Sequence, residues 1–121
     1  MSLIDPIFLT LVVGGFGFLI GGLVMRKHPP KDMNWVYGYR TKRSMASQEA
    51  WDFGQHYSSK KLILSGVIAM GISPCGFFLT QLQEPVKVVI GVILLLLFAF
   101  LPIISTERAL KREFPKGSKK S

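Results

Sequence analysis

Apolar residues in this chain gather in three long windows that contain no Asp, Glu, Lys or Arg. The windows run over residues 6–25, 62–82 and 88–105, and they hold 20, 21 and 18 residues. A helix rises about 1.5 Å per residue, so roughly 20 residues cross a hydrocarbon core about 30 Å thick. The pattern predicts an all-α membrane protein with three transmembrane helices, organised as a single membrane domain over residues 1–121.

The charged residues lie almost entirely outside these windows. The chain has 15 Lys and Arg against 7 Asp and Glu, and 14 of the 15 basic residues fall in the loop 26–61 or the tail 106–121. Three crossings put the loop and the tail on one side, which the positive-inside rule makes cytoplasmic, with the N-terminus outside. Residues 1–5 carry no Lys or Arg, so we expect the first window to be a retained helix rather than a signal peptide. The net charge of +8 therefore indicates orientation and contact with anionic lipid, and we expect no nucleic-acid partner.

Small residues and a proline distinguish the first two windows. Gly14, Gly17 and Gly21 lie on nearly one helix face and include a GxxxG, which allows helix backbones to approach closely in lipid. Their partner is either another span of this chain or a second copy, and the motif does not decide between them. Pro74 predicts a kink in the second span. We interpret the single cysteine, Cys75, as a small buried apolar residue.

The loop begins with an alternation of aromatic residues. Trp35, Tyr37 and Tyr39 occupy every second position, so an extended chain would present the three rings on one side. Aromatic rings beside basic residues are typical of anchoring at a membrane interface. A recognition surface is the alternative, in which Arg40 binds phosphate or carboxylate and Gly38 permits a close turn.

The second half of the loop predicts an amphipathic interfacial helix. Ser47 is suited to cap a helix that begins at Gln48. One face carries Glu49, Asp52, His56 and Lys60, and the other carries Ala50, Trp51, Gly54 and Tyr57. Glu49, Asp52 and His56 are weak candidates for a metal site, but a solvated polar face with an Asp52–His56 pair explains them more simply, so we expect no metal or other cofactor.

The loop carries a motif made of Asn34, Tyr37, Gly38, Tyr39, Arg40, Thr41 and Trp51. This motif resembles that of the SdpI-like family, the bacterial sporulation-delaying-protein immunity family of small membrane proteins. The resemblance covers about residues 34–105 and includes the order of the spans. It implies a bacterial inner-membrane protein that gives immunity to a membrane-active peptide toxin, coupled to signalling through a cytoplasmic regulator. It assigns no chemical role to the individual residues.

We expect a non-enzymatic protein that acts by binding. Arg40 would be the charged contact in the motif, and Trp35 and Tyr57 would be interfacial anchors. The expected partners are anionic lipids, a peptide toxin or a cytoplasmic regulator, and a second copy of the chain. The alternatives are an interfacial lipid- or peptide-modifying enzyme using the loop, and an assembly subunit of a membrane complex. Because the windows hold no ionisable side chain, proton-coupled transport is disfavoured.

Overall fold

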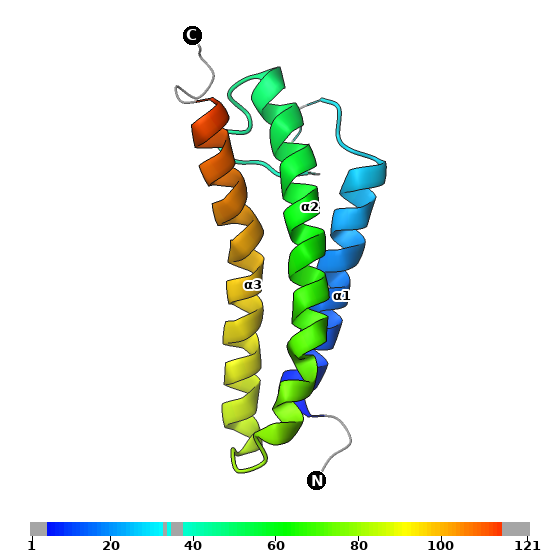
Figure 1. The fold of residues 1–121 in the computed structure, drawn as a ribbon, viewed down its shortest axis with the longest axis vertical. Helices are drawn as coiled ribbons and strands as arrows, with labels where there is room; N and C mark the ends of the chain where they lie inside the picture. The colour runs from blue at the N-terminus through cyan, green and yellow to red at the C-terminus, as the bar shows by residue number, and fades with distance from the viewer. Residues whose placement is uncertain (1–4, 33, 35–37, 115–121) are drawn as a thin grey trace.

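The computed structural model describes residues 5–32, 34 and 38–114, and in this part of the chain the regular structure is entirely helical. Helix α1 spans Pro6–Lys27 and helix α2 spans Gln48–Ile72. A short 3-10 helix, η1, follows at Ser73–Phe78, and helix α3 spans Glu84–Glu113. The three long helices run side by side as a bundle, with the turn between η1 and α3 at one end and the long loop at the other (Figure 1).

The prediction of three membrane-spanning helices is confirmed by length and composition. Each of the three long helices contains a window long and apolar enough to cross a membrane. In the most apolar window of α3 only 11% of the residues are buried within the protein. Large apolar side chains from Val88 to Ile104 are exposed along α3, as they would be on a helix that faces lipid. Helix α3 has 30 residues and is therefore about 45 Å long, so its last turns extend beyond the hydrocarbon core.

Helix α2 begins where the sequence predicts but is longer than expected. Ser47 caps it by accepting a hydrogen bond from the Ala50 amide at 3.0 Å. The segment expected to be a separate interfacial helix is continuous with the second span, so α2 runs unbroken from Gln48 to Ile72. Beside Pro74 the α-helix gives way to the 3-10 geometry of η1, which agrees with the predicted kink.

Glycines bring α1 and α2 into close contact, but they are not the GxxxG residues. A Cβ on Gly66 would lie 2.5 Å from the Gly15 carbonyl oxygen, and a Cβ on Gly22 would lie 2.9 Å from the Ser59 carbonyl oxygen. Gly17, by contrast, faces open space. The backbones of the two helices therefore touch where side chains are absent.

The other two predicted packing glycines contact side chains. A Cβ on Gly14 would overlap Leu95 of α3, and one on Gly21 would lie 3.5 Å from Leu62 of α2. The apolar core between the helices is small. It consists of Ile7, Leu11 and Ala69, with partly buried neighbours Cys75, Ile90, Leu94, Leu95 and Phe98.

Candidate functional site at the loop end

The motif loop, residues 38–44, is held against α2 by the side chain of Gln55. The Gln55 amide oxygen accepts from the Tyr39 backbone amide at 2.6 Å, and its amide nitrogen donates to the Tyr39 carbonyl at 2.8 Å. Gln55 is 1% exposed, so both bonds lie away from solvent. Gly38 has φ +105, and a side chain there would be strained and would meet Gln55. The Gln55 side chain thus replaces a backbone partner for the loop.

A second anchor comes from Glu107 near the end of α3. One carboxylate oxygen accepts from the Tyr39 hydroxyl and from the Thr41 hydroxyl, both at 2.6 Å. The other oxygen lies 3.7 Å from Nε of Arg43. Burial and the hydrogen bond to the Glu107 carboxylate raise the pKa of Tyr39 well above its ordinary value. Tyr39 therefore stays protonated and remains a donor.

Ser44 closes the motif loop on itself. Its hydroxyl accepts from the Thr41 amide at 2.8 Å and lies 3.1 Å from the Tyr39 carbonyl oxygen. Ser44 is fully buried against Gly54 of α2, where an added Cβ would come within 3.2 Å of the serine Cβ. The small residue on α2 is what allows the loop to pack so closely.

Trp51 anchors the start of the long loop. Its side chain is fully buried, and its indole N–H donates to the Pro30 carbonyl at 2.8 Å. Of the face predicted to carry Ala50, Trp51, Gly54 and Tyr57, the first three residues are buried and Tyr57 is partly buried, whereas Glu49, Asp52 and His56 on the other face are exposed. The buried face packs against the loop and against α3, where Leu110 lies 3.8 Å from the Cβ position of Gly54.

Arg40 and Lys42 are the exposed members of the motif loop. Arg40 makes no hydrogen bond or ion pair with any residue that the structure describes. Its neighbours Tyr39 and Thr41 are tied to α2 and α3, so the arginine projects from a fixed backbone. This arrangement can present a guanidinium to an anionic group without first ordering the chain.

A cavity of about 210 Å³ lies beside this loop, between the end of α1 and the start of α2. Its lining includes Arg26, Lys31, Asp52 and His56. Gln48 bridges part of it by donating to Asp52 at 2.8 Å and to the Lys31 carbonyl at 2.7 Å. Its charge is mixed, with two basic residues near the surface.

The remaining predicted site residues are spread along the chain. The Asn34 side chain donates to the Asp32 carbonyl at 3.0 Å. Trp35 and Tyr37 lie outside the described residues. Tyr57 stacks on Phe53, with ring centroids 5.5 Å apart. Within residues 5–32, 34 and 38–114, no group of three His, Cys, Asp or Glu side chains is placed to hold a metal ion.

The opposite end of the bundle, which we call the hairpin end, holds a buried ion pair that the sequence pattern does not indicate. Asp5 caps α1 by accepting from the Phe8 amide at 3.0 Å, and it accepts a second, short bond from the Lys87 ammonium. Burial alone would raise the pKa of the Asp5 carboxyl, but the bonds from Lys87 and Phe8 outweigh burial and lower it. Lys87 also donates to the Gly76 carbonyl at 3.0 Å, so the pair joins α1, η1 and α3.

Comparison with known proteins supports the family resemblance that the motif predicts. The model of the SdpI/YfhL protein family matches residues 31–106, which include the motif loop, α2 and most of α3. The chain belongs to the SdpI/YfhL family. It is 44% identical over 64 residues to the uncharacterized protein YfhL of Bacillus subtilis (strain 168). That alignment covers 53% of this chain and 58% of YfhL, so the chain spans less than two thirds of its relative. No solved structure gives a significant match.

Proposed function

We propose that this member of the SdpI/YfhL family is a non-enzymatic inner-membrane protein that gives immunity to a membrane-active peptide toxin, signals to a cytoplasmic regulator, or does both. It would act by binding a peptide or protein partner. The observation that carries the proposal is the motif loop. Its Tyr39, Thr41 and Ser44 are used in internal hydrogen bonds, while Arg40 is left exposed on a fixed backbone.

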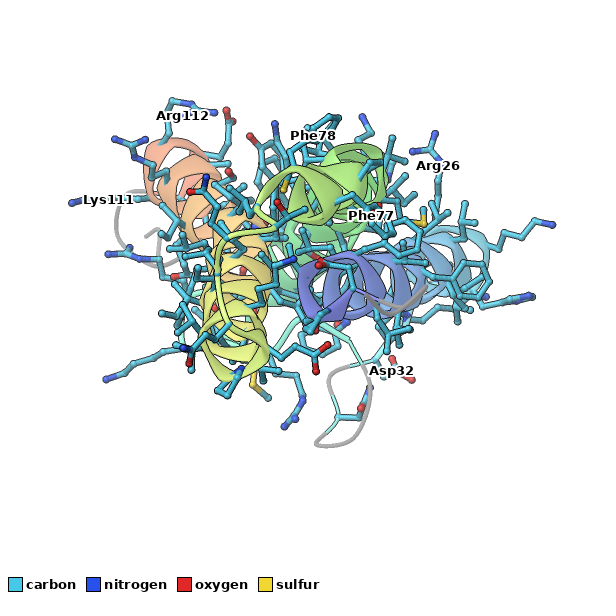
Figure 2. The ribbon with its side chains drawn as sticks, turned by 90° about the horizontal axis from the view of Figure 1, so that it is seen from below. Arg26, Asp32, Phe77, Phe78, Lys111 and Arg112 are labelled. Atoms are coloured by element: carbon cyan, nitrogen blue, oxygen red, sulfur yellow. The ribbon has the colours of Figure 1, made fainter. Side chains whose placement is uncertain are left out.

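The charge distribution supports placing the loop end in the cytoplasm. Residues at the ends of α1 and α3 add to the basic loop, and Figure 2 shows Arg26, Lys111 and Arg112 extending away from the bundle. At the hairpin end, the ammonium of Lys87 is paired with Asp5. Among the described residues, the unpaired positive charge therefore lies at the loop end, which is the distribution that the positive-inside rule expects of a cytoplasmic face.

The cavity beside the motif loop supports an anionic partner. Arg26 and Lys31 border it at the end of α1, where the chain leaves the membrane. Arg40 does not line this cavity, but it lies on the motif loop that Gln55, a lining residue, holds in place, and its planar guanidinium suits phosphate or carboxylate. An anionic headgroup or an acidic segment of a cytoplasmic regulator would complement these three residues.

The immunity claim is tested by survival of a toxin-sensitive bacterium that expresses the chain. Cells with the native chain should tolerate more peptide toxin than cells with an empty vector. If Arg40 makes a charge-assisted contact worth about 1.5–3 kcal/mol, Arg40→Ala should lower the tolerated dose by roughly 10–100-fold. Lys42→Ala, an equally exposed basic residue two positions away, is the matched control.

Survival no better than the empty vector, at confirmed membrane expression, would refute immunity to that toxin. Equal protection by the native and Arg40→Ala chains would refute the role of Arg40.

A further inference from the structure

A second cavity, of about 340 Å³, lies at the hairpin end of the bundle. The N-cap of α1, helix η1, the turn after it and the first turn of α3 line this cavity. Figure 2 looks onto this end, with Phe77 between η1 and the start of α1. The rings of Phe77 and Phe8 confirm that contact, with centroids 4.9 Å apart.

The Lys87 ammonium borders this cavity, and one of its three donors has no acceptor among the described residues. The side chain is 9% exposed, and it donates to the Asp5 carboxylate and to the Gly76 carbonyl. An ammonium has three N–H donors, and the described residues supply no third acceptor. Each oxygen of the Asp5 carboxylate already accepts one hydrogen bond, from Lys87 and from the Phe8 amide. A buried donor of this kind favours a ligand that brings an acceptor.

Glu84 provides a hydrogen-bond acceptor in the same cavity, where Lys87 provides a donor. It lies in the first turn of α3, three residues before Lys87 and so on the same helix face. Glu84 is exposed, and it makes no hydrogen bond or ion pair within the described part of the chain. Among the residues that the structure describes, the cavity therefore offers an unpaired carboxylate one helical turn away from an ammonium with one remaining N–H donor.

The depth of the cavity matches the headgroup layer. Helix α1 has 22 residues, or about 33 Å, which is close to the thickness of a hydrocarbon core. Its first residue adjoins the cavity, so the cavity lies where the hydrocarbon ends. Phe77 and Leu82 give it apolar walls, and the neighbouring Phe78 is 83% exposed. An apolar chain could follow this surface into the bilayer.

We propose that this cavity binds the headgroup of phosphatidylethanolamine. The ethanolamine ammonium would donate to Glu84, and a phosphate oxygen would accept the unused hydrogen of Lys87. Phosphatidylglycerol lacks the ammonium, and its negative charge would face the two carboxylates Asp5 and Glu84. Phosphatidylcholine has a quaternary nitrogen without an N–H, so it cannot donate to Glu84. The charge pattern thus selects a zwitterion that carries N–H donors.

Thermal unfolding in lipid nanodiscs tests this proposal. The full chain is placed in phosphatidylcholine discs alone, or in discs supplemented with phosphatidylethanolamine or with phosphatidylglycerol. Binding to the folded state raises Tm, so phosphatidylethanolamine should raise it by several degrees over both other compositions. Glu84→Gln, at an exposed position, should fold normally and lose that rise. Glu113→Gln at the far end of the same helix is the matched control and should keep it.

Equal Tm values in the three compositions would overturn the proposal. So would a rise that persists in Glu84→Gln, because the effect would then come from the bilayer as a whole. Stabilisation by a short apolar peptide with a free amino terminus, with none from phosphatidylethanolamine, would replace the lipid by a peptide ligand.

Discussion

Replacing Glu107 should release the motif loop without changing its sequence. The carboxylate accepts hydrogen bonds from Tyr39 and Thr41, and bonds of hydroxyls to a charged acceptor contribute about 1.5–3 kcal/mol each. Because the Glu107 side chain is 30% exposed, we take the lower value for both, or about 3 kcal/mol in total. Since 1.4 kcal/mol is a factor of ten, Glu107→Ala should increase loop opening by roughly 100-fold.

Hydrogen exchange of the loop amides in detergent micelles measures this opening. The amides of Tyr39, Thr41 and Ser44 are hydrogen bonded in the native loop, so their exchange reports its release. Glu107→Gln retains one neutral acceptor and should give an intermediate acceleration of about tenfold. Glu113→Gln, an exposed glutamate on the same helix, is the control. Exchange in Glu107→Ala within about threefold of native would refute the role assigned to Glu107.

Three further results are expected. Because the pKa of Tyr39 is raised, the contribution of its hydrogen bonds to stability is complete below pH about 10 and is lost as the pH rises further. The phenolate absorbance of the folded native chain at pH about 11 should therefore match that of Tyr39→Phe, and ionisation of all three tyrosines before unfolding would contradict this. Gly66→Ala should destabilise the chain by about 1–3 kcal/mol, because the added Cβ meets backbone atoms of α1, whereas Gly71→Ala faces open space and should not destabilise it. Equal Tm values for the two variants would disprove that contact. Asp5→Asn should lower the free energy of unfolding by about 3–5 kcal/mol, because it leaves the buried Lys87 ammonium without its carboxylate. Denaturant unfolding of the double variant with Lys87→Met should show part of this stability restored, and additive losses would argue against the pair.

The number of long helices and their approximate positions can be predicted from the sequence. The uncharged windows locate the spans, and Ser47 marks the start of α2. The uncharged window begins at Leu62, but the helix does not begin there. The absence of charge marks the part of the chain that can lie in the hydrocarbon core, whereas the helix continues through this boundary. A segment that is more polar in its first half and apolar in its second half can still form one continuous helix, as α2 does.

The motif residues were predictable, but their partners were not. Tyr39 and Thr41 stand in a recognisable stretch, whereas Gln55 and Glu107 lie 16 and 66 to 68 residues away. A signal for Gln55 was available, because it follows Trp51 by one helical turn on the buried face. Glu107 gave no periodic signal, since its burial depends on how α3 packs. The glycines of closest backbone contact could not be selected from the sequence for the same reason. Five glycines in α1 look alike, and only the packing shows that Gly15 and Gly22 meet the backbone of α2, while Gly14 and Gly21 face side chains.

The proposed function requires the anchored motif loop to position Arg40 for a partner. The most direct test is toxin survival of cells that express Glu107→Ala, a change that leaves Arg40 in place and frees the loop that carries it. At equal amounts of protein in the membrane, we expect Glu107→Ala to lose most of the protection that is lost in Arg40→Ala, while Glu113→Ala protects as the native chain does. Full protection by Glu107→Ala, together with loss of protection in Arg40→Ala, would show that Arg40 acts without an anchored loop.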